Sequence, residues 1–125
     1  MSRRPWYPVA GIALLAFGVA AVSGAPDPAR GKAAFEHRCI GCHAMDADKE
    51  GPRLRGVYGR VAGAVTSFEY SEAMKKSHIT WDETTIGKWL EDPDGLVPDN
   101  NMPFRVVNAD ERGDIIAYLK TLSAK

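Results

Sequence analysis

The sequence is poor in cysteine and histidine and carries no net charge. Its 125 residues contain two cysteines and three histidines, and 16 basic side chains balance 16 acidic ones. A disulfide between Cys39 and Cys42 would close too short a loop to stabilise much, because the entropy removed from the unfolded chain grows with loop length. A structural zinc ion needs four ligands, and the only histidines outside the cysteine segment are His37 and His78. The zero formal charge argues against a nucleic-acid-binding protein, which normally has a strong basic excess.

Residues 1–25 have the composition of an export signal. Two arginines precede an apolar run over residues 9–22, and small residues follow it. This order is typical of a cleaved signal peptide, here with cleavage after Ser23 or Ala25. The sequence therefore predicts that residues 26–125 form one small domain outside the cytoplasm, in the periplasm.

The alternative is that the same segment stays in place as a membrane anchor. Residues 9–25 reach the lower limit of about 17 residues for a transmembrane helix. Trp6 and Tyr7 stand where an interfacial aromatic belt would lie. An anchor over residues 6–25 would bring the domain into contact with the membrane but leave it on the same outer side.

The two cysteines belong to the segment Cys39-Ile40-Gly41-Cys42-His43. Two cysteines three positions apart, with a histidine directly after the second, are typical of a c-type haem attachment site. Thiols on about one helical turn can each bond one vinyl group of the same porphyrin, and the adjacent imidazole can bind the iron. A thioredoxin-like dithiol would need a βαβ setting, and no strand pattern precedes Cys39. We therefore expect one haem c, attached through Cys39 and Cys42, with His43 as an iron ligand.

Helical signals occur at both ends of the domain and in its second half. Asp27-Pro28 predicts the start of a helix that ends at about Arg38, just before the attachment motif. Further helices are predicted over about residues 71–76, 82–90 and 108–122. Residues 92–104 hold three prolines, so we expect a stiff loop there. The predicted fold class is therefore all-α, with four or five helices and loops wrapped around the haem.

Gly31 lies inside the first predicted helix, where a glycine costs about 1 kcal/mol relative to alanine. Such a glycine is often present because another backbone comes close. We therefore expect a close backbone contact at Gly31.

A six-coordinate haem iron needs a second protein ligand opposite His43. Met45 and His37 lie too close to His43 along the chain to reach the other face of the haem. Met74, Met102 and His78 remain as candidates. Met102 lies in a proline-bounded loop that can be held rigidly, and a thioether ligand raises the reduction potential toward the range of electron carriers. These residues favour Met102 and leave the other two open.

Several short markers follow one another along the domain. Beside the attachment motif they are Gly31-Lys32-Ala33-Ala34-Phe35, Gly51-Pro52-Arg53-Leu54, Tyr58-Gly59-Arg60, Ile79-Thr80-Trp81, Asn101-Met102-Pro103-Phe104 and Ile116-Ala117-Tyr118-Leu119. In this order and at this spacing, the chain from about Gly31 to Leu119 resembles the class I c-type cytochromes, which include mitochondrial cytochrome c and its bacterial relatives. The resemblance implies the small cytochrome c fold for residues 26–125.

The resemblance also implies roles for individual residues at the haem. His43 and Met102 would be the two axial ligands, and the Pro52 carbonyl would accept a hydrogen bond from the second imidazole nitrogen. Three side chains would hydrogen-bond a buried propionate, namely Arg60, Tyr70 and Trp81. Phe104 would pack against the exposed haem edge.

The function that the resemblance implies is one-electron transfer rather than enzymatic catalysis. The expected redox partners are a cytochrome bc-type complex and a terminal oxidase or reaction centre, in a respiratory or photosynthetic chain. We expect a monomer that does not bind nucleic acid. The alternative is a haem enzyme or gas sensor of the peroxidase-like kind, in which Met102 is displaced. Against it, no distal histidine or arginine is placed recognisably for peroxide cleavage.

The sequence departs from the mitochondrial pattern around the predicted methionine ligand. Trp89 and Met74 stand where the mitochondrial form has a tyrosine and an asparagine, so the pocket beside Met102 is less polar. The lysines that ring the haem edge in that form are largely missing, with Asp94 and Asn101 among the replacements. We therefore expect weaker attraction to acidic partner surfaces.

Overall fold

The computed structural model describes residues 1–5, 8, 18 and 24–123. Most of the segment 6–25, in which the signal peptide or anchor is expected, lies outside the described residues. Within the described part of the chain, no helix combines the length and the apolar character that crossing a membrane requires.

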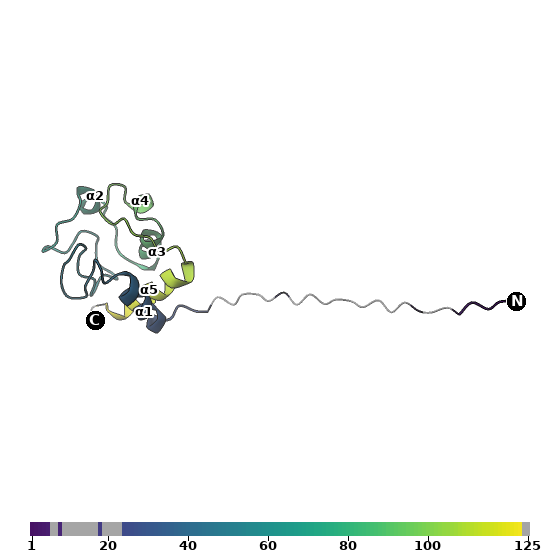
Figure 1. Cartoon of the computed structure of the whole chain (residues 1–125). Coiled ribbons are helices and arrows are strands. Elements are labelled where there is room, and N and C mark those ends of the chain that lie inside the picture. The colour runs from purple at the N-terminus through teal and green to yellow at the C-terminus, as the bar shows by residue number, and fades with distance from the viewer. Residues whose placement is uncertain (6–7, 9–17, 19–23, 124–125) are drawn as a thin grey trace.

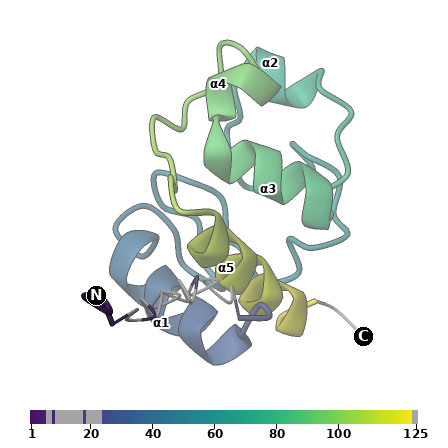
Figure 2. The same ribbon diagram turned by 90° about the vertical axis from the view of Figure 1, so that its right-hand side faces the viewer.

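The described part of the chain folds into five helices joined by long loops (Figure 1). The helices are α1 Pro28–Arg38, α2 Glu72–Lys75, α3 Glu83–Glu91, α4 Pro93–Leu96 and α5 Ala109–Thr121. In place of strands, the described residues form an isolated bridge between Val61 and Thr80. Figure 2 shows α1 crossing α5 at one end of the domain, α3 beside α5, and α2 and α4 at the other end. The all-α prediction is confirmed.

Local signals account for where α1 and α3 begin. The Asp27 carboxylate caps α1 by accepting the backbone N–H of Ala29 at 2.7 Å, and proline occupies the first helical position. At α3, Asp82 and Thr85 form a reciprocal capping box with two bonds of 2.8 Å. The helix bounds therefore agree closely with those expected from the sequence.

The stretch 92–104 was expected to be a loop, and this expectation is wrong at its start. Residues Pro93–Leu96 form the short helix α4, which the Val97 N–H closes by donating to the Pro93 carbonyl at 2.9 Å. Proline suits the first turn of a helix because its φ is already helical and that position needs no N–H donor. Pro93 thus starts a helical turn here instead of excluding one.

The crossing of α1 and α5 is close enough to require glycine. A Cβ at Gly31 would overlap the backbone carbonyl of Asp114, so the close contact expected at Gly31 is present. Beside the crossing, the Phe35 and Tyr118 rings pack with centroids 5.6 Å apart. The start of α1 is therefore held directly against the middle of α5.

An ion pair between an exposed arginine and a buried carboxylate fastens the same crossing. Asp114 is only 7% exposed, and the Arg30 guanidinium donates to both of its carboxylate oxygens at 2.8 and 2.9 Å. The backbone N–H of Asp27 donates to the same carboxylate at 2.7 Å. These hydrogen bonds, chiefly those from Arg30, hold the pKa of Asp114 below its ordinary value. The buried carboxylate is therefore fully paired.

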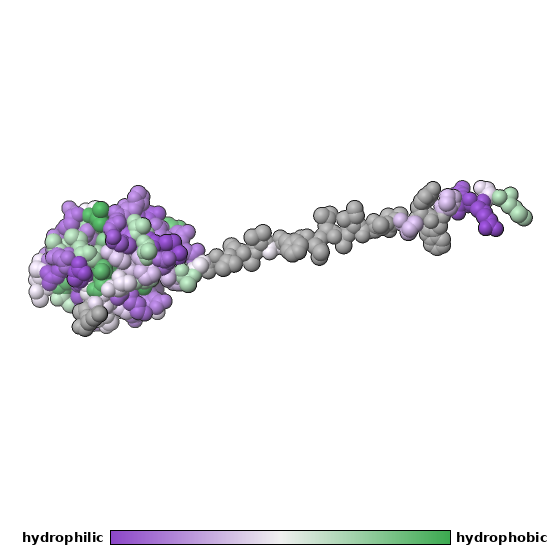
Figure 3. Space-filling model, turned by 90° about the horizontal axis from the view of Figure 1, so that it is seen from below, coloured by the Kyte–Doolittle hydropathy of each residue, from purple (hydrophilic) through white to green (hydrophobic). Residues whose placement is uncertain are grey.

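The core lies between the α1–α5 crossing and α3. Its most deeply buried side chains are Val106 and Ile115. Val106 also donates its N–H to the Leu90 carbonyl at 2.7 Å, which ties the segment before α5 to the end of α3. Outside the core, the face seen in Figure 3 mixes hydrophilic and hydrophobic residues in small groups.

Candidate haem site

A cavity of about 530 Å³ opens between α1, α3, α5 and the loops. This volume lies within the range of about 300–1,000 Å³ that is usual for cofactor and small-molecule sites. All nine site residues expected from the sequence line this one cavity, namely Cys39, Cys42, His43, Pro52, Arg60, Tyr70, Trp81, Met102 and Phe104. The rest of the lining is mostly apolar and includes Val57, Ile86 and Leu119. An apolar cavity with few polar groups fits a porphyrin disc.

The two cysteines lie on a single turn at the C-terminal end of α1. The backbone N–H groups of Cys42 and His43 both donate to the Cys39 carbonyl, at 3.1 and 2.9 Å. Both thiols are free and line the cavity, as attachment of one porphyrin requires. Burial raises the pKa of the Cys39 thiol to about 11, so this side chain is a neutral thiol before attachment.

The His43 ring is fixed in one orientation. Its Nδ1 lies 2.8 Å from the Pro52 carbonyl oxygen. A carbonyl can only accept, so Nδ1 carries the proton and Nε2 keeps the lone pair that a metal needs. Burial lowers the pKa of His43, which also favours the neutral ring. Gly51 provides the space, because a Cβ there would overlap the imidazole.

The sequence left three candidates for the ligand opposite His43. Met74 and Met102 both line the cavity, whereas His78 is an exposed residue that is not part of the lining. Met74 is buried within the core cluster, while Met102 is partly buried and packs against that cluster. The structure thus brings both methionines to the site and leaves His78 outside it.

The Met102 loop is held by a residue that sequence reasoning missed. The Asn100 side-chain oxygen accepts the Met102 N–H at 2.7 Å. Its amide nitrogen donates to the Val97 carbonyl and to the Asp94 carboxylate, each at 2.9 Å. An asparagine two residues before a predicted ligand is a signal for such a turn, because its short side chain readily bonds nearby backbone groups.

A second tie holds the chain just after this loop. Arg112 on α5 donates from Nη1 to the carbonyls of Val106 and Val107, both at 2.8 Å. Together with the bond from Val106 to Leu90, this arrangement fixes the segment that follows Phe104. Nothing in the local sequence predicted the tie, because it joins a helix to a loop through a long side chain.

Polar donors enter the cavity beside its apolar lining. Arg60 donates to the Arg53 carbonyl at 2.9 Å, and burial lowers the pKa of this guanidinium, which has no carboxylate partner among the described residues. Tyr70 accepts the Val65 N–H at 3.3 Å and keeps its hydroxyl proton for another acceptor. No described residue accepts the indole N–H of Trp81. This donor set fits a buried carboxylate.

Aromatic side chains complete the lining. Trp81 and Trp89 pack with their ring centroids 5.5 Å apart, and both line the cavity. Phe104 lines it as well but remains 37% exposed. Trp81 is thus the buried part of this aromatic lining, Trp89 is partly buried, and Phe104 reaches the surface.

Comparisons with known proteins point to the same kind of site. The family model described as cytochrome c matches residues 28–123. Cytochrome c2 iso-2 of Magnetospirillum fulvum is 46% identical over 87 residues, which cover 67% of this chain and 91% of the relative. Cytochrome c 2.1 of Caenorhabditis elegans is 40% identical over 104 residues, covering 81% of this chain and 94% of the relative. The solved structure of cytochrome cH from Methylobacterium extorquens has a TM-score of 0.72 at 41% identity, covering 76% of this chain and 98% of that chain.

The fold and the cavity define a small helical domain built to enclose a porphyrin. The chain belongs to the cytochrome c family. Members of this family bind haem c covalently through cysteines, and the relatives are cytochromes that carry electrons rather than enzymes. The expectations of a haem c cofactor, of the cytochrome c fold and of an electron carrier are confirmed.

Proposed function

We propose that the protein carries single electrons with a haem c whose axial ligands are His43 and Met102. One observation supports this most directly: the oriented imidazole and the Asn100-held methionine line the same cavity as both attachment cysteines. When bound, the haem supplies an iron couple that gains or loses one electron.

The two ligand side chains have different tasks. Pro52 keeps the His43 ring in place and makes Nε2 a better donor, as second-shell partners of metal-bound imidazoles do. Met102 supplies a thioether, a weaker donor that favours the reduced state and so raises the potential. If His43 and Met102 both held the iron, no open position would remain there for a small molecule.

The cavity donors have an electrostatic task. Arg60, Tyr70 and Trp81 would hold one haem propionate by donating hydrogen bonds to it. A carboxylate removed from water needs such partners, because an unpaired buried charge is costly. The half-buried Arg60 guanidinium, which has only carbonyl partners within the protein, would gain its counter-charge in this way.

The proposed setting is the periplasm, where a cytochrome bc-type complex donates electrons and a terminal oxidase or reaction centre accepts them. The arginines and apolar run of residues 1–25 support export, with a cleaved signal favoured over an anchor across residues 6–25. The protein would act as a monomer in a respiratory or photosynthetic chain.

The test is the optical spectrum of the haem-loaded ferric protein with and without cyanide. A methionine-to-iron charge-transfer band and slow cyanide uptake are expected, because Met102 must first leave the iron. A high-spin spectrum with rapid cyanide binding would contradict the proposal and support a peroxidase-like enzyme or gas sensor.

A further inference from the structure

The chain that joins α4 to α5 carries Met102 and is anchored unevenly on its two sides. Before Met102, the Asn100 side chain holds the loop through three hydrogen bonds. After Met102, residues 103–105 are exposed, and no backbone hydrogen bond holds them within the described part of the chain. The next backbone tie is the N–H of Val106, which donates to the Leu90 carbonyl at 2.7 Å. An exposed stretch without backbone hydrogen bonds is where local opening is expected.

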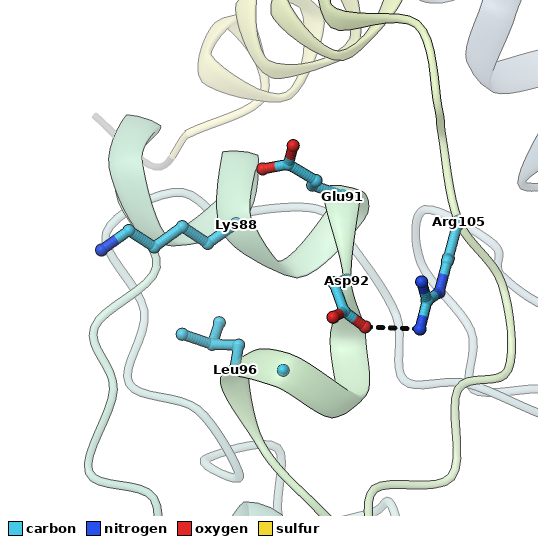
Figure 4. A pocket seen from close by; sticks show the side chains of 6 residues that line it. Lys88, Glu91, Asp92, Leu96 and Arg105 are labelled. Atoms are coloured by element: carbon cyan, nitrogen blue, oxygen red, sulfur yellow. Dashed lines mark ion pairs between the residues drawn. The ribbon is translucent and has the colours of Figure 1, made fainter.

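A side chain ties this stretch to the rest of the fold. Figure 4 shows the guanidinium of Arg105 directed toward Asp92, with 2.6 Å between the charged atoms. The same figure shows Lys88, in the same groove, directed away from the pair. The Glu91 carboxylate lies 3.5 Å from the Arg112 guanidinium. Neither neighbouring charge therefore competes for the Asp92–Arg105 contact.

Asp92 occupies a firm position at the junction of two helices. Its N–H donates to the Lys88 carbonyl at 2.9 Å in α3, and its carbonyl accepts the Leu96 N–H at 3.2 Å in α4. Aspartate is a favoured residue for capping a helix, yet the Asp92 side chain makes no capping hydrogen bond to α4. Gly95 leaves room for the carboxylate, because a Cβ there would lie 2.5 Å from Asp92 Oδ2. The carboxylate is thus free to hold Arg105.

The Asp92–Arg105 contact is an ion pair and not a well-formed hydrogen bond. Asp92 Oδ1 is covered and lies within ion-pair distance of the guanidinium, but the contact lacks hydrogen-bond geometry. The Arg105 and Asp92 side chains are 54% and 44% exposed. Ion pairs this exposed add little to the stability of a whole fold, and salt screens them. We therefore expect this pair to act on the loop more than on global unfolding.

We propose that Asp92 and Arg105 are a positioning pair for Met102. By holding the chain that follows Met102 against the junction of α3 and α4, the ion pair slows release of the methionine sulfur from the haem iron. The proposal rests on the proposed axial ligation, because it takes Met102 to be the ligand whose release is slowed.

The test measures how fast cyanide replaces Met102 in the haem-loaded ferric protein. At saturating cyanide the rate reaches a plateau, which is set by release of the methionine. Asp92→Asn keeps the size of the side chain but removes its charge, so the plateau should rise about two- to fivefold, the range expected of an exposed ion pair. Arg105→Gln should have the same effect. The double variant should rise no further, because both substitutions remove one interaction.

Asp46→Asn is the matched control. It breaks an ion pair between Asp46 and Arg55 that also measures 2.6 Å, and neither of these residues lines the haem cavity. The control should leave the plateau at the wild-type value. The proposal is overturned by a wild-type plateau in both Asp92→Asn and Arg105→Gln, by multiplied effects in the double variant, or by an equal rise in the control.

Salt distinguishes a charge interaction from simple packing. Raising the salt concentration from 0.01 to 1 M shortens the Debye length from about 30 Å to about 3 Å. The plateau of the wild type should rise about twofold, whereas that of Asp92→Asn should stay constant, because its ion pair is already lost. Equal salt effects in the two proteins would contradict the proposal.

Amide hydrogen exchange reports the same opening without using the iron. Asp92→Asn should speed exchange of the Val106 N–H, which borders the stretch that Arg105 holds, and Asp46→Asn should leave it unchanged. A Val106 amide that exchanges as slowly in Asp92→Asn as in the wild type would overturn the proposal. Failure of the axial ligation would look different, because the wild type itself would then bind cyanide rapidly and show no methionine band.

Discussion

Replacing Gly31 by alanine tests how closely α1 and α5 must approach. The added Cβ would overlap the Asp114 carbonyl and lie 2.9 Å from the Tyr118 Cβ. Neither obstacle is the end of a flexible side chain, so the helices themselves must move apart. Overpacking of this kind costs about 1–3 kcal/mol or more, against a gain of about 1 kcal/mol in helix propensity. We expect Gly31→Ala to lower the free energy of unfolding by about 2 kcal/mol.

The matched control is Gly87→Ala in the middle of α3. There the nearest atom to an added Cβ is the Ile116 Cδ1 at 3.7 Å, an ordinary contact. The propensity gain should therefore appear alone, raising the free energy of unfolding by about 0.5–1 kcal/mol. Guanidinium unfolding of the haem-loaded proteins, followed by circular dichroism, gives both values. If Gly31→Ala were as stable as Gly87→Ala, the close crossing described here would be wrong.

Three further predictions concern the Arg30–Asp114 ion pair and the methionine loop. Arg30 lowers the pKa of Asp114, so this ion pair stabilises the fold above the ordinary carboxyl pKa of 3.8, and the stabilisation is lost as the pH falls through the lower folded pKa. Asp114→Asn should therefore reduce the fall of the unfolding free energy at acidic pH. An unchanged fall would contradict the assignment. Asn100→Ala should lower the free energy of unfolding by about 1–2 kcal/mol and let cyanide displace Met102 faster. Unchanged cyanide kinetics would show that Asn100 does not position the loop. The methionine-to-iron charge-transfer band of the ferric protein should persist as the pH rises to the ordinary lysine pKa of about 10.4. The loop that carries Met102 has no lysine to replace the sulfur, and Glu72 raises the pKa of Lys75. Loss of the band at lower pH, together with an electron paramagnetic resonance signal of an amine ligand, would refute this.

Much of the fold follows from signals that are local in the sequence. Asp27-Pro28 marks the start of α1, because a carboxylate cap and a proline act within one turn. The spacing of Cys39, Cys42 and His43 indicates the cofactor for the same reason, since the chemistry needs those groups on one turn. Gly31 indicates a close approach but not its partner, which lies 83 positions away on α5.

The features that could not be predicted depend on contacts between distant segments. Asn108 and Glu111 have the spacing of a capping box at the start of α5, but only half of it forms. Asn108 accepts the Glu111 N–H at 2.9 Å, whereas the Glu111 carboxylate pairs with Arg38. Arg112 holds two carbonyls of the preceding segment through a long, flexible side chain. In each case several partners were chemically suitable, and only the packing of the helices decided among them.

The central claim is that Met102, and not the other cavity methionine, is the second axial ligand. Its most direct test is the methionine-to-iron charge-transfer band of the ferric protein in Met102→Ala and Met74→Ala. We predict that Met102→Ala keeps the covalent haem but loses the band and has a lower potential, because both thioether attachments remain while the thioether ligand is gone. Met74→Ala should keep the band. A band that persists in Met102→Ala and disappears in Met74→Ala would contradict the account.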